Sequence, residues 1–457
     1  MAELDTAMER TLVSLLDEKK YTTLQDILTT MNPSDIAAVF EELDQSRLPL
    51  LYRLLPKELA AETFVEMEPD AQELLISGFS DKELKEVLDE LYVDDAVDIV
   101  EEMPASVVKR ILRQADPKMR TEINELLRYP DDSAGSLMTT EFVTLRPDMT
   151  VAEAIKRIRR TGIDKETINT CYVTKDKKLI GAISIRTLLL ADDSELVEHI
   201  MEDNVISVTT LTDQEEVVQV LSKYNFTAVP VVDGEDRLVG IITIDDAMDV
   251  MEDEATEDIK KMAAILPSEH SYMKSSVFEL WRHRIPWLLF LMLSATFTGL
   301  IISHFETALA AQVALASFIP MLMGTGGNSG SQTSVTIIRG LSLGDLEFSD
   351  LFQIVWKEIR VAVLCGVCLA AACYLKIMLI DRLMLHNPTI TNTVALVVCL
   401  SLAITVLLAK VIGAILPLLG KKLGFDPAVM ASPFITTIVD TLSLLVYFRV
   451  ALIFLPL

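Results

Sequence analysis

The stretch Pro320–Gln332, PMLMGTGGNSGSQ, lies inside a long apolar tract in the last third of the sequence and carries four glycines, an asparagine and a glutamine. Small residues let membrane helices pack closely, which is one explanation of this composition. The density of polar groups favours a second explanation, a broken helix beside a water-filled cavity where freed carbonyls meet water or an ion. We therefore expect Gly327, Asn328 and Gln332 to line such a cavity.

Apolar tracts dominate after residue 285 and predict five membrane-spanning helices, at about 286–304, 308–338, 359–380, 392–417 and 428–455. Each tract can cross a hydrocarbon core of about 30 Å. Basic residues mark the cytoplasmic side of such spans. They cluster before the first span, between the second and third, and between the fourth and fifth, at Arg282, Arg284, Arg339, Lys357, Arg360, Lys421 and Lys422. We therefore expect a multi-pass protein of the plasma membrane with a cytoplasmic N-terminus and an outer C-terminus.

The last predicted span contains a carboxylate, Asp440, in PFITTIVDTLSLL. A charge at this depth costs about 3 kcal/mol and therefore suggests a function. Thr436 and Thr437 share its helical face, and Pro433 is expected to free further carbonyls. An ion pair with Lys410 is the alternative explanation, but a site of hard oxygen ligands on an aqueous path fits the composition better.

Carboxylate, hydroxyl and carbonyl oxygens favour Mg²⁺ or Ca²⁺ over softer metals. Mg²⁺ keeps much of its water and is often held by one or two carboxylates. One aspartate per chain is too little for a full cage, so a two-fold homodimer that brings two copies together is expected. An intramembrane aspartyl protease would need a second aspartate, and no other lies within the predicted spans.

Charge divides the chain into two parts. Residues 1–281 hold 59 acidic and 29 basic side chains, whereas 282–457 hold 8 and 11. The excess of about −30 argues against nucleic acid and anionic lipid as partners. It is typical of either a solvated surface or a surface that binds cations. Cys365 and Cys368 have the spacing of a metal or redox pair, but no second pair or nearby histidine accompanies them, so neither zinc nor a disulfide is expected. MAELDTAMER at the N-terminus lacks the apolar core of a cleavable signal peptide.

Short amphipathic helices are predicted throughout residues 1–130. LKEVLDEL and AVDIVEEM each place their apolar residues on one face. Ser80 and Glu83 match a capping box, and Asn32 and Asp116 each precede a proline at the first helical position. Such a series predicts a right-angled or superhelical stack.

Residues 137–250 contain an internal repeat. LM followed by FVT recurs as IM followed by VIS, and LIGAIS recurs as LVGIIT. Each copy predicts the order strand, helix, strand, glycine turn, strand, helix, which resembles a tandem pair of CBS domains. Such domains bind adenine nucleotides or sense ions. The nucleotide signature, Thr or Ser with Asp three residues later, is complete only in the second copy, at Thr243 and Asp246, so ATP is a candidate ligand there.

The helix predicted after Thr243 is strongly acidic: Asp246, Asp249, Asp253 and Glu257 lie along one stripe. Like charges at this spacing destabilise a helix. Solvent, basic neighbours or bound cations must offset the repulsion.

Over nearly its whole length the sequence resembles the MgtE family of magnesium transporters. YPDDSAGSLM at 129–138 is similar to that family's domain junction, and GGNSGSQ at 326–332 and SPFITTIVD at 432–440 to its pore signatures. The implied multidomain fold has an α-helical superhelical N domain, α/β tandem CBS domains, a plug-like helix and an all-α transmembrane domain of five helices. The corresponding residues are 1–130, 131–250 (copies at about 137–199 and 200–250), 251–281 and 282–457.

The resemblance implies a homodimeric, Mg²⁺-selective channel-like transporter, not an enzyme, with Asp440 as its ion-binding aspartate. It also implies that the cytosolic domains bind Mg²⁺ and close the pore when Mg²⁺ is abundant. The sensor residues it implies are Asp94 and Asp98 in the N domain and Asp246, Asp249, Glu254, Glu257 and Asp258 on the connecting helix. A transporter for Mn²⁺ or Co²⁺ with the same regulation is the alternative. Lys410 departs from the family pattern, where a small or apolar residue is expected.

Overall fold

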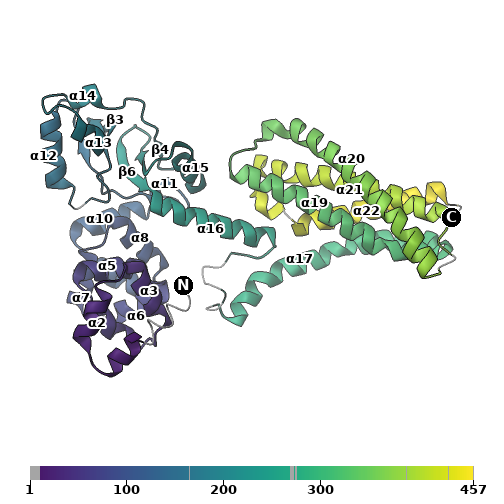
Figure 1. Cartoon of the computed structure of the whole chain (residues 1–457), viewed down its shortest axis with the longest axis horizontal. Helices are drawn as coiled ribbons and strands as arrows, with labels where there is room; N and C mark the ends of the chain where they lie inside the picture. The colour runs from purple at the N-terminus through teal and green to yellow at the C-terminus, as the bar shows by residue number, and fades with distance from the viewer. Residues whose placement is uncertain are drawn as a thin grey trace. The chain divides into compact units, whose positions relative to one another are not determined.

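The structure is a computed structural model that describes residues 11–163, 165–267, 272, 275–386, 389–430 and 432–455. The first ten residues, on which the expectation of no signal peptide rests, lie outside this description. The chain forms two compact units, Met1–Val250 and Met251–Leu457, which are described separately below (Figure 1).

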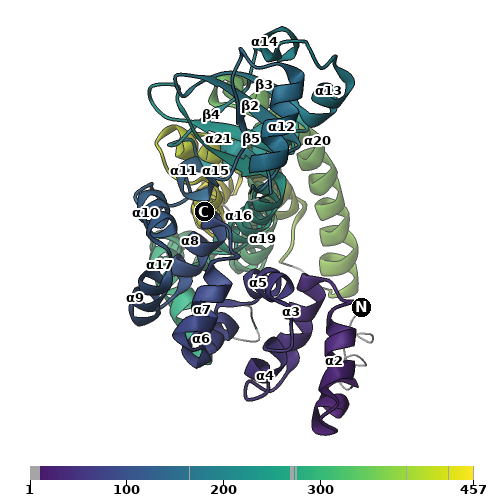
Figure 2. The ribbon, with the colours of Figure 1, turned by 90° about the vertical axis from the view of Figure 1, so that its left-hand side faces the viewer.

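The first unit begins with a stack of short helices, coloured purple to blue in the lower part of Figure 2. Alternate helices pack on one another, α3 on α5, α5 on α7 and α7 on α9, as a superhelical stack requires. The predicted apolar faces, including Leu84, Leu88 and Val100, are buried in a common core. The helices are α2 (Tyr21–Leu28), α3 (Pro33–Glu42), α4 (Leu48–Tyr52), α5 (Lys57–Val65), α6 (Pro69–Gly78), α7 (Asp81–Leu88), α8 (Val93–Glu102), α9 (Ala105–Gln114) and α10 (Pro117–Leu126).

The sequence signals for helix starts are largely confirmed. Ser80 and Glu83 form the predicted capping box at α7, and Asp116 accepts a hydrogen bond from the Met119 amide at 2.6 Å. Asn32 precedes α3, but its side chain makes no capping hydrogen bond.

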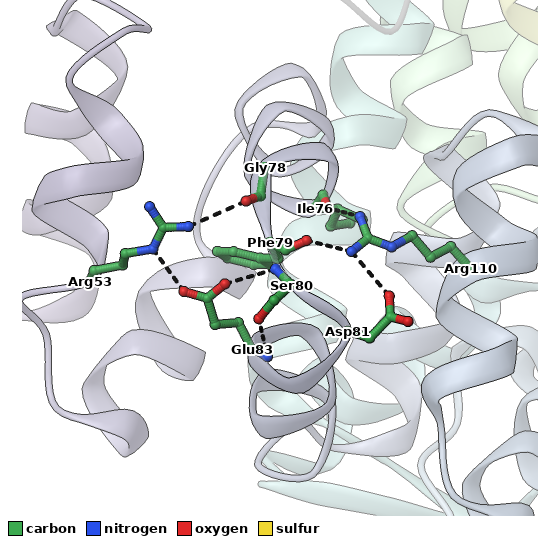
Figure 3. A network of polar contacts seen from close by, with 8 residues as sticks. All are labelled: Arg53, Ile76, Gly78, Phe79, Ser80, Asp81, Glu83 and Arg110. Carbon is green, nitrogen blue, oxygen red and sulfur yellow. Dashed lines mark hydrogen bonds and ion pairs between the residues drawn. The ribbon is translucent and has the colours of Figure 1, made fainter.

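Two arginines hold the turn between α6 and α7 from opposite sides (Figure 3). Arg53 donates to Glu83 at 2.8 Å and to the Gly78 carbonyl at 3.3 Å, and Arg110 donates to the carbonyls of Ile76 and Phe79. These carbonyls lie at the C-terminal end of α6, where helix carbonyls lack partners one turn further on, and only that of Ile76 also accepts a hydrogen bond from the Phe79 amide, at 3.4 Å. The arginines therefore satisfy groups that would otherwise need water.

The repeat folds as two three-stranded sheets of the same topology. In each sheet the first strand pairs parallel with the second, and the second pairs antiparallel with the third. The first copy contains β1 (Thr144–Leu145), α12 (Val151–Thr161), β2 (Thr170–Lys175), β3 (Lys178–Ser184), α13 (Ile185–Leu190) and α14 (Val197–Ile200). The second contains β4 (Val208–Thr209), α15 (Gln214–Tyr224), β5 (Ala228–Val232), β6 (Leu238–Thr243) and α16 (Ile244–Met262). The predicted order of elements is confirmed.

The two copies exchange their leading segments. Thr139 bridges to Ile241 of the second sheet, and Glu202 bridges to Ala182 of the first. Met138 therefore packs directly on Gly240 and Met201 on Gly181, where a side chain on either glycine would collide with the methionine. A short helix, α11 (Ala134–Leu137), joins this pair to the helical stack. The stack and the second copy share one hydrophobic core, whereas the first copy has a core of its own.

The second unit is helical, and α21 lies at its centre, packed on α19, α20 and α22. Four described segments are long and apolar enough to cross a membrane: Val277–His304, Phe348–Met384, Asn392–Lys422 and Pro427–Phe454. The elements are α17 (Val277–His304), α18 (Glu306–Ala311), η1 (Val313–Phe318), α19 (Ile319–Ser342), η2 (Phe348–Asp350), α20 (Leu351–Lys376), η3 (Ile377–Met384), α21 (Asn392–Lys422), η4 (Pro427–Met430) and α22 (Ser432–Phe454).

The second predicted span, 308–338, is corrected. Its first part is α18 and the 3-10 turn η1, and α19 follows as an unbroken α-helix through the whole of PMLMGTGGNSGSQ. The expected break in this stretch is therefore wrong. At 24 residues α19 is long enough to span, but its glycine and polar content keeps it outside the four apolar segments.

Candidate ion path and acidic cluster

The glycines of α19 serve close helix packing. A Cβ at Gly326 would meet Thr405 of α21 and Val439 of α22, and one at Gly327 would meet Thr436. The first explanation of the polar stretch, small residues that let helices approach, is the one that the structure bears out. Because Val439 precedes Asp440, the same contacts bring the polar part of α19 against the turn of α22 that holds the carboxylate.

Asp440 lies in the third turn of α22 and is partly buried. Within the described residues its carboxyl has no hydrogen bond or ion pair. Thr436 and Thr437 donate to the Pro433 carbonyl at 2.9 and 3.0 Å, so that carbonyl is occupied and not freed. Pro433 lies in the first turn of α22, where a proline does not interrupt the helix. The carboxylate therefore stands beside hydroxyl oxygens that keep acceptor capacity.

Asn328 and Gln332 are exposed on α19, one turn apart, whereas Gly327, Ser329 and Gly330 are buried. Polar side chains on the open face of a helix in an apolar unit need water or a further polar surface beside them. The grooves between α17 and α22, of about 300 and 360 Å³, do not provide this, because apolar side chains such as Phe290, Phe434 and Leu442 dominate their walls.

Lys410 does not pair with Asp440, so that alternative is wrong. Its ammonium lies 3.7 Å from the Glu358 carboxylate and donates to the Thr333 hydroxyl at 3.2 Å, and Thr333 donates to Glu358 at 3.0 Å. The Lys410 side chain is 7% exposed. Sequence analysis missed Glu358, because it lies at the edge of a predicted span.

A cluster of carboxylates forms in the first unit where α8, α16 and the first CBS copy meet. Asp94 and Asp98 come from α8 and Asp246 from α16, as the sensor prediction requires. Three further carboxylates adjoin them and were missed: Asp95 of α8, Glu141 before β1 and Glu166 between α12 and β2. Asp95 could have been predicted, because it adjoins Asp94 in the sequence. Glu141 and Glu166 lie in loops with no local pattern that predicts them.

Burial raises the pKa of Asp94 to about 6 and that of Asp246 to about 7, and neighbouring carboxylates add to both shifts. Burial and the charges of Asp94 and Asp246 raise the pKa of Glu166 to about 8. The pKa of Asp98 is raised for the same reasons, although its side chain lies at the solvent-exposed edge of the cluster. No lysine or arginine contributes to any of these shifts.

The Asp94 carboxyl is only partly satisfied by hydrogen bonds. Thr139 hydrogen-bonds to it, but its Oδ1 atom is buried without a partner. Such an atom calls for a proton or a cation. Among the described residues no three Asp, Glu, His or Cys side chains converge closely enough to hold one ion directly. Carboxylate oxygens are ligands of hard cations such as Mg²⁺, which is often held through its own water molecules.

The second half of α16 contains a lysine that pairs with nearby acidic residues. Lys261 lies 2.6 Å from Glu257 and 2.6 Å from Asp426, which precedes η4. Asp258 hydrogen-bonds with Ser342, and burial together with the charge of Asp426 raises its pKa. Asp249 and Glu254 also have interaction partners. Part of the predicted repulsion on this helix is thus offset by a lysine, and Asp426 is a further acid that sequence analysis missed.

The candidate nucleotide residues differ between the two copies. In the second, Thr243 is buried and donates to Asp246 at 2.6 Å. In the first, Ser184 contacts Thr187 at 2.8 Å, so no carboxylate stands at that place. Asp246 belongs to the acidic cluster as well as to the nucleotide signature.

Family models match three parts of the chain: the MgtE divalent cation transporter over 319–450, the MgtE intracellular N domain over 31–132, and the CBS domain over 134–194 and 197–253. The magnesium transporter MgtE of Thermus thermophilus is 38% identical over 451 residues, 97% of this chain and 98% of the relative. That of Bacillus subtilis is 32% identical over 444 residues, 97% and 96% of the two chains.

Two solved structures resemble the first unit. The cytosolic domain of the Mg²⁺ channel MgtE in complex with ATP has a TM-score of 0.51 and 38% identity, and covers 53% of this chain and 99% of its own. The soluble part of a magnesium transporter has a TM-score of 0.51 and 32% identity, and covers 55% and 99%. Because the likeness of sequence extends along nearly the whole of both chains, this protein belongs to the MgtE family of divalent cation transporters, membrane proteins that are not enzymes.

Proposed function

We propose that this chain is a Mg²⁺-selective, channel-like transporter whose ion path runs between α19 and α22 past Asp440. The observation that carries the proposal is the Asp440 carboxylate, which has no partner among the described residues although it lies in a membrane helix. The relatives are named magnesium transporters, which favours Mg²⁺ over Mn²⁺ and Co²⁺ as the ion. A single carboxylate with neighbouring hydroxyls suits an ion that keeps its water.

We infer that the working form is a homodimer. One carboxylate binds a divalent ion weakly, and a two-fold axis would bring two copies of Asp440 to one path. The open polar face of α19, with Asn328 and Gln332, is the surface that such a partner would complete.

We propose that cytosolic Mg²⁺ closes this path by binding the acidic cluster. Carboxylates of Asp94, Asp98 and Asp246 repel one another without a cation, so the compact form of the first unit is disfavoured when Mg²⁺ is scarce. Mg²⁺ acts only through its tighter binding to the compact form. Weak sites on the connecting helix, at Asp249, Glu254, Glu257 and Asp258, would add to the coupling and make the response steep.

ATP is a proposed second ligand, at Thr243 and Asp246 of the second CBS copy. The complex of ATP with a relative's cytosolic domain supports it. We also propose that the protein lies in the plasma membrane. The basic residues favour a cytoplasmic N-terminus.

The test is Mg²⁺ influx into proteoliposomes that contain the purified full chain. We expect Asp440→Asn to reduce influx to the level of empty liposomes, because the ion loses its only charged ligand. Asp345→Asn, in the exposed loop after α19, is the matched control and should transport like the wild type. Influx of Mg²⁺ through Asp440→Asn at the wild-type rate would refute the proposed path. Faster influx of Mn²⁺ or Co²⁺ than of Mg²⁺ would favour the alternative ion.

A further inference from the structure

A buried charged triad joins three helices of the second unit. Lys410 of α21 contacts Glu358 of α20 and Thr333 of α19, and Thr333 also donates to Glu358. The side chains of Lys410 and Glu358 are 7% and 17% exposed. Ionisable residues inside a membrane protein are costly, so a complete triad there calls for an explanation in terms of function.

The place of the triad on α19 gives that explanation. One turn before Thr333 is Gly330, where a Cβ would meet Ile435 and the Ala409 carbonyl, and Gly413 packs against the Gly330 backbone. The helices α19 and α21 therefore cross at small residues, and Lys410 donates its hydrogen bond to Thr333 next to this crossing.

Close packing of small residues alone defines the rotation of α19 poorly. The helix contains five glycines, each of which lowers helix propensity and offers no side chain to hold the helix in place. A directed contact between Lys410 and the Thr333 hydroxyl fixes both the rotation and the height of α19. Gln332 is adjacent to Thr333 and Asn328 lies on the turn before it, so the same contact sets where these polar side chains point.

We propose that Lys410 is a positioning residue of the ion path: through Thr333 and Glu358 it holds the polar face of α19 in register with Asp440 of α22. It neutralises Glu358 at the same time, so the path keeps a single uncompensated carboxylate per chain. Lys410 does not contact the ion. The inference rests on the proposed function in that α19 is taken to line the path.

The test uses the full chain in proteoliposomes and compares Lys410→Met, Glu358→Gln and the double variant. Removal of either charge leaves its partner buried and alone, and we expect influx per folded protein to fall by at least about tenfold. The double variant removes both charges and should lose no more influx than the worse of the two single variants, because the two substitutions act on one interaction. Lys421→Met is the matched control on the same helix: Lys421 donates to the Leu341 carbonyl, away from the triad, and influx should stay within about twofold.

Thr333 separates positioning from packing. Thr333→Ser keeps the hydroxyl and loses a methyl group, whereas Thr333→Val keeps the volume and loses the hydroxyl. We expect the serine variant to transport like the wild type and the valine variant to change the ratio of Mg²⁺ to Co²⁺ influx by about threefold, since a rotated α19 alters the two ions' contacts unequally. A purely structural role would instead harm the serine variant and leave the ratio unchanged in both.

Wild-type influx and ion ratio in Lys410→Met, or a double variant whose loss equals the two single losses combined, would overturn the proposal. Thermal melting of the same purified variants distinguishes this failure from failure of the proposed function. Non-additive melting shifts for Lys410→Met and Glu358→Gln are expected even if the wild type carries no Mg²⁺, whereas additive shifts would show that the pair is not coupled.

Discussion

The acidic cluster of the first unit and the charged triad of the second solve the same problem in opposite ways. Asp94 and Asp246 are buried beside other carboxylates with no basic side chain among the causes of their shifts. Glu358 is enclosed by protein too, but Lys410 stands 3.7 Å away. A fixed ammonium makes a permanent arrangement, whereas carboxylates without a basic side chain among them depend on the protons or cations that the solution supplies. The contrast is what the proposed function requires, a rigid path in one unit and a responsive sensor in the other.

The pH dependence of the first unit should give the largest effect. The carboxyl groups of the cluster have pKa values between about 6 and 8 in the folded chain, above the value of about 4 in an unfolded one. Because the folded chain keeps these protons to a higher pH than the unfolded chain, stability falls as the pH rises from about 4 to about 8, and the window from pH 5.5 to 8.5 covers most of that fall. We expect residues 1–262 to melt about 5 °C or more higher at pH 5.5 than at pH 8.5 without Mg²⁺.

Glu83 serves as an internal contrast, because its hydrogen bond from Arg53 lowers its pKa to about 2. Its contribution is lost only below about pH 4.5, outside this window. Equal melting temperatures at pH 5.5 and 8.5 would contradict the account of the cluster.

A single substitution should reproduce part of that effect. Asp94→Asn removes one buried charge and gives the orphaned carboxyl position a donor, so we expect a higher melting temperature without Mg²⁺, by about 3 °C, and a smaller gain when Mg²⁺ is added. Differential scanning fluorimetry over a Mg²⁺ series measures both quantities. Asp203→Asn, an exposed acid of the same unit, should change neither. A lower melting temperature in Asp94→Asn would mean that its charge stabilises the fold.

A helix cap provides an effect on stability that is independent of Mg²⁺. Ser80→Ala removes the capping box of α7 and should lower the free energy of unfolding of residues 1–262 by about 1 kcal/mol. Urea unfolding with and without Mg²⁺ should give the same loss. Ser106→Ala, an exposed position within α9, is the control. A loss of unfolding free energy that changes with Mg²⁺ would contradict this prediction, because it would couple the stability of α7 to Mg²⁺ binding at the acidic cluster.

The smallest effect is expected at Lys261, the one lysine that contacts Asp426 among the described residues. Its side chain is 22% exposed and that of Asp426 is 33% exposed, so the pair contributes at most about 1 kcal/mol. Lys261→Met should raise the cytosolic Mg²⁺ needed for half-closure by about twofold, because Mg²⁺ must then offset more repulsion. Lys261→Arg keeps the charge and should behave like the wild type. No change in the methionine variant would mean that this pair does not take part in closure.

Patterns local in sequence predicted the fold well. The capping box at Ser80, the amphipathic faces of α7 and α8 and the repeat of β2–β3 in β5–β6 all follow from neighbouring residues. The predicted break in α19 was wrong because glycine has two uses. It can open a helix, or it can let other helices approach, and only the positions of Thr405, Thr436 and Ile435 decide between them.

The sites divide in the same way. The resemblance to the family singled out Asp440, Asp94 and Asp246 as candidates. Glu141, Glu166 and Glu358 could not be singled out, because contacts between distant segments bring them to their clusters. No spacing rule connects Glu358 with Lys410, since they lie on different helices. The departure of Lys410 from the family pattern indicated a special position without revealing its partner.

The central claim is that the acidic cluster senses Mg²⁺ and that the path past Asp440 closes in response. The most direct measurement is Mg²⁺ influx into proteoliposomes as Mg²⁺ on the face of the first unit is raised to several millimolar. We compare the wild type with the triple variant Asp94→Asn, Asp98→Asn and Asp246→Asn. The account predicts that the wild type closes and that the triple variant keeps its influx. Equal suppression of both proteins, or of neither, would contradict it.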